Sequence, residues 1–543
     1  MSTSDHPNFD LVHQPWLRVR NIDGRSEELG ILRALGLAHQ LAVLSGDVPT
    51  QTFALTRMLL AVLHGALAGP PDDNTWKKLW GAEQLPVDVI AAYLGTHRER
   101  FDLFHAETPF MQVAGLHTAS GATTGTPTLI ADVPNNRKFF TTRLGVDYSL
   151  TYAEAARWLV HCQAFDISGI KTGAVGDARV KGGRGYPIGV GWGGLLGGVL
   201  LEGTTLKETL LLNLMAGDFI EFPRDPQLDR PVWEREPVTA AEEVPGGRPV
   251  VGPVDLYTWQ SRRVRLIPEA GRVRDAMICN GEKLTPQNMH RAEPHTAWRR
   301  SEPQEKKLGL SLVYMPRVHD PDRAIWRGLQ SLLPGVASRQ KGDAAPALSP
   351  GIMDWLGHLV IEEMIPEDHA VRVHAIGMAY GPQDSTTSDI VDDVVGLRAV
   401  LASQDAVDLA GVAVSCAAAA EVAGRTVGNL AGDLAAAAGG DGAGRRNRAM
   451  ESVFAELDSP FRRWLAGLRG DSDTVAVQVE WHKTARTLVT ATADDLLSRI
   501  PPACWEGREV RGHQLTAAHA AARFRRDLSQ ALPFAYAEKA APT

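Results

Sequence analysis

Apolar residues recur with a helical period in two stretches near the start of the chain. From Leu29 to Leu44 and from Thr50 to Leu67 they lie three and four positions apart, and Pro70 follows the second stretch. Before them, Phe9–Val19 alternates apolar and polar residues around Pro15, which is typical of an edge strand or a hairpin. We therefore expect a strand followed by two helices.

From Phe101 to about Pro382 the pattern is mixed. Apolar runs of strand length, at Leu310–Tyr314 and Val371–Ile376, stand among short helices and long polar connections. Connections of that length inside a compact region are usually functional or disordered. The long connections between Phe101 and Pro382 are therefore either functional or disordered.

After Gly381, alanine-rich amphipathic segments predict four helices, at about Ala402–Ala437, Arg446–Leu468, Asp473–Ile500 and Gly512–Leu532. The glycines and prolines between them leave connections short enough for antiparallel neighbours. The period does not decide between strand and helix for Asp389–Leu401. We expect an α+β protein in which a large mixed α/β N-terminal domain, residues 1–384, precedes a C-terminal four-helix bundle, residues 385–543.

Length, hydrophobic content and net charge limit the possible functions of the protein. The chain has 543 residues with 44% hydrophobic content, enough for a proper core, and a formal net charge of −8. A net acidic protein does not coat long nucleic acid unaided. Any nucleic-acid contact must therefore rest on local basic patches or on the charge of a partner.

The four cysteines include no C-x-x-C pair, so they indicate neither a zinc site nor a disulfide framework, and we expect buried, reduced thiols. The N-terminus lacks a basic segment followed by an apolar one, and no stretch approaches the apolar length of a membrane span. We expect a cytoplasmic protein with no membrane contact, no metal and no cofactor.

The most distinctive segment is Gly169–Gly198. It holds 12 of the 52 glycines together with four cations, Lys171, Arg179, Lys181 and Arg184. Glycine permits positive φ and the close approach of another surface, and basic side chains favour an anionic guest. The segment is either a loop that meets an anionic backbone or a flexible linker.

Three other motifs are ambiguous when taken alone. Pro134–Arg143 interleaves basic, amide and aromatic residues, as both nucleic-acid contacts and surface hairpins do. Tyr380–Ser385 is a turn whose tip projects the amide of Gln383 between a strand and the helical region. The pair His319-Asp320 is similar to part of a metal-dependent phosphohydrolase site, but further ligands at helical spacing are missing.

In chain order these pieces resemble the CasA family, the large subunit of the type I-E CRISPR surveillance complex Cascade. Four strings carry the resemblance: Phe9–Val19, Phe104–Gln112 (FHAETPFMQ), the glycine segment with Leu206–Leu214, and Gly377–Gln383 (GMAYGPQ). The second string is the most specific, and the likeness spans most of the chain.

The resemblance implies a protein without catalytic activity of its own. Such a protein recognises the protospacer-adjacent motif in double-stranded DNA, opens the duplex so that guide RNA pairs in an R-loop, and helps recruit the helicase-nuclease in antiviral defence. The implied partners are the crRNA-bearing backbone and handle-binding subunits, the small bundle subunit of Cascade, the crRNA 5′ handle, the target DNA and the helicase-nuclease.

The resemblance also implies positions for the site. The family's glycine loop, which enters the minor groove, falls on Gly169, Lys171, Thr172 and Gly173. Its lysine finger falls on Lys283, and its glutamine wedge falls on Gln383. The loop that engages the crRNA handle and neighbouring subunits falls on Asn135, Asn136, Arg137, Lys138, Phe139 and Phe140.

Two rival interpretations stay open. One is a metal-dependent nuclease or phosphohydrolase centred on His319-Asp320, which DNA cleavage by the pure protein would favour. The other is a helical scaffold with no nucleic-acid role, for which changes in the glycine loop would have no effect.

Overall fold

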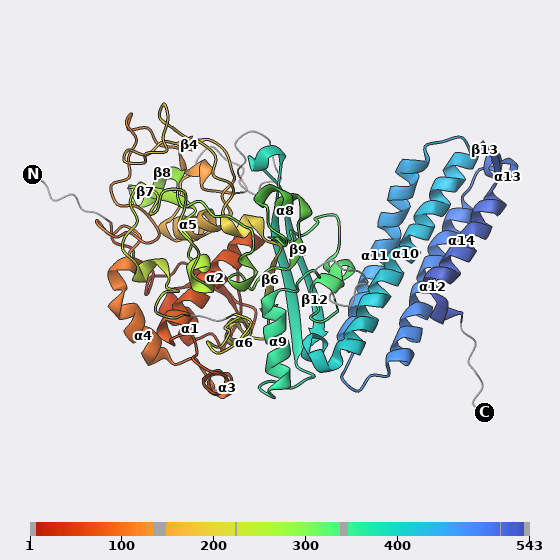
Figure 1. Ribbon diagram of the computed structural model, residues 1–543, viewed down its shortest axis with the longest axis horizontal. Helices are drawn as coiled ribbons and strands as arrows, with labels where there is room; N and C mark the ends of the chain where they lie inside the picture. Colours follow the sequence, from red (N-terminus) through yellow and green to blue (C-terminus); the bar gives the residue numbers. More distant parts are fainter. Residues whose placement is uncertain are drawn as a thin grey trace, which may run out of the picture. The chain divides into compact units, whose positions relative to one another are not determined.

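The computed structural model describes residues 7–131, 133, 148–222, 225–336, 346–510 and 512–536 (Figure 1). The chain forms two compact units. The first comprises Met1–Asp322, Gly342–Leu356 and Arg372–Val394, and the second Arg323–Lys341, Gly357–Val371 and Val395–Thr543. The second unit therefore includes two pieces of chain from before residue 385, where the sequence analysis begins the bundle.

An N-terminal antiparallel sheet has the strand order β2-β1-β3. It joins β1 (Leu17–Asn21), β2 (Ser26–Leu29) and β3 (Leu41–Leu44). Of the segment Phe9–Val19, predicted as an edge strand or a hairpin, only Leu17–Val19 is strand, and β1 is the central strand of the sheet rather than an edge strand. The helix predicted up to Leu44 is wrong beyond α1 (Ile31–Gly36), because the last residues pair with β1 and satisfy their backbone groups there.

Helices α2 (Pro49–Ala66) and α5 (Tyr152–Phe165) pack on each other in the first unit. The prediction for α2 is confirmed to within a residue at each end. A capping box of Thr151 and Glu154 fixes the start of α5, and α5 ends beside Asp166. The shorter helices of this unit are α3 (Asp73–Gly81), α4 (Val87–Thr96), α6 (Leu206–Leu212), α7 (Pro253–Tyr257) and α8 (Glu302–Leu308).

A long hairpin of β11 (Ala370–Tyr380) and β12 (Thr387–Arg398) forms a sheet with β6 (Gly198–Glu202) in the order β12-β11-β6. The strand predicted at Val371–Ile376 is confirmed, and the undecided segment after it is mostly strand. Three shorter hairpins pair β4 (Lys171–Thr172) with β5 (Arg184–Gly185), β7 (Arg262–Glu269) with β8 (Arg272–Asn280), and β9 (Trp298–Arg300) with β10 (Tyr314–Pro316). The prediction of a strand at Leu310–Tyr314 is therefore wrong for the first four residues. Only its last residue, Tyr314, lies in a strand, β10.

Four long helices lie side by side in the second unit (Figure 1), as predicted. They are α10 (Val407–Ala437), α11 (Gly442–Gly467), α12 (Thr474–Ser498) and α14 (Ala517–Ala531). Small residues of α10 let its neighbours approach, since a Cβ on Gly424 would meet the ring of Phe454. Between α12 and α14 lie α13 (Pro502–Glu506) and the hairpin of β13 (Arg508–Val510) and β14 (His513–Leu515), and α9 (Gly351–Ile361) runs from the first unit into the second.

One described helix, Gln404–Ala437, is long and apolar enough to cross a membrane by length and composition alone. The expectation that no stretch approaches that length is therefore wrong. Most of this helix is α10, which packs against α11, α12 and α14. Its apolar composition thus serves the packing of a bundle core.

A piece of chain that precedes the bundle completes its core. Trp326, in the 3₁₀ helix Ile325–Ser331, is fully buried, and its ring stacks on that of Phe461 with 4.4 Å between centroids. The indole N–H donates to the Asp458 carboxylate at 2.8 Å. The bundle therefore depends on residues that its helical pattern does not include.

Replacing Trp326 by Ala should destabilise the second unit by about 3 kcal/mol, because the substitution leaves a cavity beside Phe461. Urea unfolding of the full chain, followed by circular dichroism, measures this as a lower midpoint for the helical transition. Trp505, which is 60% exposed, provides the control, and Trp505→Ala should move the midpoint little. Equal midpoints for the two variants would contradict the assignment of Trp326 to the core.

Candidate nucleic-acid interface

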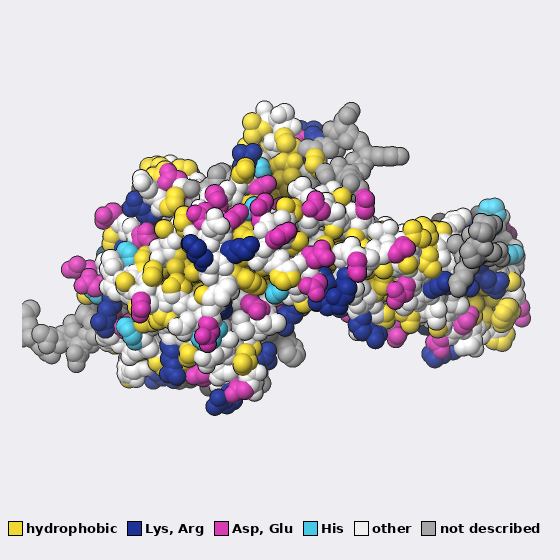
Figure 2. Space-filling view, turned by 90° about the horizontal axis from the view of Figure 1, so that it is seen from below, with side chains coloured by type: hydrophobic (Ala, Val, Ile, Leu, Met, Phe, Trp, Pro, Cys, Tyr) yellow, Lys and Arg dark blue, Asp and Glu magenta, His cyan; other side chains and the backbone are white. Residues whose placement is uncertain are grey.

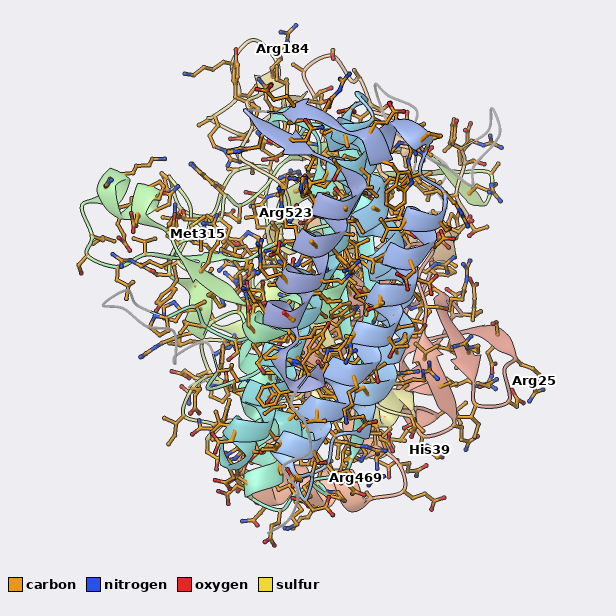
Figure 3. The ribbon with its side chains drawn as sticks, turned by 90° about the vertical axis from the view of Figure 1, so that its right-hand side faces the viewer. Arg25, His39, Arg184, Met315, Arg469 and Arg523 are labelled. Carbon is orange, nitrogen blue, oxygen red and sulfur yellow. The ribbon has the colours of Figure 1, made fainter. Side chains whose placement is uncertain are left out.

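The glycine segment is an ordered hairpin rather than a flexible linker. Strands β4 and β5 pair Lys171 with Gly185, and beyond them Lys181 and Arg184 exchange two backbone hydrogen bonds of 3.0 and 3.1 Å. Between these two cations, Gly182 and Gly183 have φ of +58° and +74°, the geometry of a tight turn that side chains disfavour. All four residues of this tip are exposed, and Figure 3 shows Arg184 at its outer edge.

The two glycines that the resemblance implies as the groove-facing loop have different roles here. Gly169 has φ of +133° and open space where a Cβ would stand. Gly173 is buried, and a Cβ there would meet Val180 at 2.5 Å and the backbone of Gly183 at 2.8 Å. Gly173 therefore lets the two arms of the hairpin close, and Thr172 beside it is half-buried.

Lys171 is held in a buried ion pair. Its ammonium group lies 2.6 Å from the carboxylate of Asp166, and the Lys171 side chain is only 13% exposed. The guanidinium of Arg262, at the start of β7, pairs with the same carboxylate. Burial alone would raise the pKa of Asp166, but the two cations outweigh it and hold this pKa below its ordinary value. Lys171 thus has an intramolecular anionic partner.

Lys283 is exposed on the connection that follows β8. The glycine segment packs beside this connection, because Arg179 donates to the carbonyl of Gly281 at 2.9 Å and Asn280 donates to that of Tyr186 at 2.6 Å. The fold therefore brings the predicted lysine finger close to the base of the glycine hairpin.

Gln383 is exposed at the tip of the β11–β12 hairpin. The prediction that this turn joins the α/β region to the bundle is wrong, because a strand follows it and pairs back along β11. Gln383 and Asp384 have φ of +58° and +54°, which costs about 1 kcal/mol or more for each non-glycine residue. Neighbouring contacts hold this conformation: the amide of Ser168 donates to the carbonyl of Asp384 at 2.8 Å, and the hydroxyl of Tyr380 donates to that of Phe165 at 2.8 Å.

Three of the predicted elements therefore lie on neighbouring segments: the glycine hairpin, the connection carrying Lys283 and the turn carrying Gln383. The predicted handle loop, Asn135–Phe140, lies outside the described residues. The sequence indicated Lys181 and Arg184 as cations of the glycine segment but not that they flank a hairpin turn, although paired glycines are a recognised signal for such a turn. Sequence reasoning also missed Asp166 and Arg262, which carry no local signal.

His319 is half-buried. Its ring nitrogen Nε2 lies 2.9 Å from the carbonyl oxygen of Gly198, and burial lowers its pKa, which favours the neutral ring. In the part of the chain that the structure describes, no group of three or more His, Cys, Asp or Glu side chains is arranged to hold a metal ion. The four cysteines are buried and free, as expected.

Charge is distributed locally. Among the described side chains on the face drawn in Figure 2, Lys and Arg are interspersed with Asp and Glu and form no broad basic field. Side chains of both signs on this face provide no long-range potential that would attract an anionic backbone.

A family model described as "CRISPR-associated protein Cse1" matches residues 10–492. The chain is 34% identical over 351 residues to "CRISPR-associated protein CasA/Cse1" of Thermus thermophilus, an alignment that covers 63% of this chain and 62% of that protein, under two thirds of its length. The crystal structure of Thermobifida fusca Cse1 matches with a TM-score of 0.91 and 45% identity, covering 98% of this chain and 100% of that one.

A chain of a structure described as "CRISPR RNA-guided surveillance complex" shares the fold, with a TM-score of 0.70 and 20% identity over 97% of this chain and 100% of that one. The family model covers most of the chain, and the strings quoted from the sequence lie at or within its limits. This chain therefore belongs to the Cse1 (CasA) family, the large subunit of the type I-E Cascade, and the resemblance found from its sequence is confirmed.

Proposed function

We propose that this chain reads the protospacer-adjacent motif of double-stranded DNA for a Cascade-like complex and opens the duplex beside it. The observation that carries this proposal is the hydrogen bond from Ser168 to Asp384, which ties the glycine hairpin to the turn bearing Gln383. The hairpin is suited to contact a groove, and the turn is suited to enter a base stack. The hydrogen bond fixes the position of one relative to the other.

The tip Lys181–Arg184 is our candidate for the groove contact. Two glycines without side chains let the backbone approach base edges closely, and the flanking cations neutralise phosphates on either side. Since Lys171 is paired with Asp166, we assign the phosphate contacts to Lys181 and Arg184, with Lys283 as a further donor.

Gln383 is our candidate for the wedge. Its amide both donates and accepts hydrogen bonds, so it can occupy a vacated stacking position. Unstacking one base step costs about a few kcal/mol, so the wedge must be held rigidly and phosphate contacts must offset the cost. The left-handed backbone at Gln383, supported by Ser168 and Tyr380, provides that rigidity.

The remaining roles follow from the family. We propose a non-catalytic, cytoplasmic subunit that assembles with crRNA-bearing backbone subunits, the handle-binding subunit and the small bundle subunit. After R-loop formation it helps recruit the helicase-nuclease. The fold shared with a chain of an RNA-guided surveillance complex supports assembly into such a particle.

In the reconstituted complex, Gln383→Ala should leave binding to a closed duplex nearly intact and slow strand opening. Permanganate reactivity of thymines beside the motif measures the opening rate, which should fall about tenfold or more because the wedge offsets an unstacking cost of a few kcal/mol. A duplex already unpaired at that step should rescue the variant. Gln514→Ala, at an exposed glutamine near the end of the bundle, is the control, and wild-type opening by Gln383→Ala would remove this residue from the wedge role.

The double variant Lys181→Ala/Arg184→Ala should weaken DNA binding and flatten its salt dependence. Each lost phosphate contact reduces the slope of log affinity against log salt by about 0.9, so two contacts give a change of about 1.8. Gel shifts of the reconstituted complex at several salt concentrations measure this. Lys306→Ala/Lys307→Ala, at exposed lysines of α8, is the matched control; equal slopes for both pairs would refute the phosphate contacts.

The purified chain should leave DNA and RNA intact in the presence of Mg²⁺ or Mn²⁺. The ring of the half-buried His319 lies against the carbonyl of Gly198, and the described residues include no group of three or more His, Cys, Asp or Glu side chains that could hold a metal ion. Incubation with labelled nucleic acid followed by gel electrophoresis measures this. Cleavage that disappears in His319→Ala or Asp320→Ala would instead support the nuclease alternative.

A further inference from the structure

We propose that Asp166 is a positioning residue that fixes the glycine hairpin relative to the Gln383 turn and thereby sets how sharply the complex discriminates between motifs. This inference rests on the proposed function of those two elements. Asp166 itself contacts no DNA in this proposal, and it acts through Lys171, Arg262 and its own backbone.

The carboxylate of Asp166 is the centre of the arrangement. It lies at the end of α5 and is 6% exposed, with Lys171 of β4 at 2.6 Å and Arg262 of β7 also paired to it. Helix α5 and strands β4 and β7 are thereby joined at a single buried anion. Two cations sharing one anion in a buried site are strongly destabilised when the anion is removed.

Arg262 contacts the chain on both sides of the glycine hairpin. One of its terminal nitrogens, Nη2, donates to the carbonyl of Ile167 at 2.9 Å and to that of Gly189 at 2.8 Å. The carbonyl of Asp166 also accepts the amide of Gly191 at 2.9 Å. The residues just before and just after the hairpin are thus fastened to the same place.

The turn carrying Gln383 is fastened to this place by two hydrogen bonds. These are the bonds from Ser168 to Asp384 and from Tyr380 to Phe165, and both involve residues within two positions of Asp166. A cavity of about 40 Å³ lies beside the end of α5 and the turn, lined by Asp166, Cys162, Ser385–Thr387 and the segment Pro127–Ala131.

The position of the hairpin should affect general DNA affinity and discrimination between motifs to different extents. Phosphate contacts at the exposed Lys181 and Arg184 need only charge, which tolerates small displacements. Discrimination between base edges needs a fixed backbone position, since contact geometry decides it. We call the Asp166–Lys171–Arg262 cluster the clamp. Loosening it should therefore reduce discrimination between motifs more than it reduces affinity for DNA in general.

The test compares the wild-type complex with Asp166→Asn, using gel shifts on duplexes with a permissive motif, a changed motif or no motif. We expect the affinity ratio between permissive and changed motifs to fall about tenfold, while affinity for DNA without a motif changes by less than about threefold. In Asp166→Asn/Lys171→Met one of the two buried cations is removed together with the anion, so the melting temperature should recover in part while the ratio stays low.

Val453→Ala, at a buried position of α11, controls for lost stability in general. The proposal is overturned if Asp166→Asn keeps the wild-type ratio, or if Val453→Ala lowers the ratio as much at an equal loss of melting temperature. Hydrogen exchange of the isolated chain provides a readout that does not depend on DNA. Asp166→Asn should speed exchange at Ser168, Gly191 and Gly381 together and leave the β1–β3 sheet unchanged.

Unchanged exchange at those three amides would also overturn the clamp. If the wild-type complex binds permissive and changed motifs equally well, the proposed function is wrong. In that case the hydrogen-exchange result alone decides whether the clamp exists.

Discussion

A buried carboxylate shared by two cations organises the part of this protein that we assign to DNA. Asp166 would be expensive to bury alone, and Lys171 and Arg262 would be expensive without it. Together they form a cluster with a net positive charge, whose members come from the end of a helix and from two separate hairpins. The stability of each of these segments is therefore linked to the position of the others.

Glycine serves two purposes in the hairpin, and only one of them concerns a partner. Gly173 is required because the opposite arm of the hairpin occupies the space of a side chain. Gly182 and Gly183 adopt positive φ at an exposed tip where a Cβ would meet nothing within 4 Å. A partner surface could approach there without obstruction, which is why the tip and not the base is our candidate for the groove contact.

The helical bundle shows the same dependence on distant parts of the chain. Its longest helix, α10, is apolar enough to pass for a membrane span, yet three helices and a preceding 3₁₀ segment pack around it. Glycine positions on α10 accept large side chains: Gly424 lies against Phe454 and Gly428 against Met450. Trp326 enters this core from a segment that lies before the long hairpin in the sequence.

Local patterns predicted the four bundle helices, α2, the strand at Val371–Ile376 and the buried cysteines, because periodicity and composition are local properties that survive in many contexts. Short strings of residues indicated the family. Contacts between distant residues were needed to establish that Leu41–Leu44 is a strand, that Gln383 lies at the tip of a β hairpin and that Lys171 pairs with Asp166. Arg262 and Asp166 are 96 positions apart, and no local pattern records that they meet. Strand pairing and buried charge pairing are contacts between distant residues, and their energy outweighs the local preferences that a sequence displays.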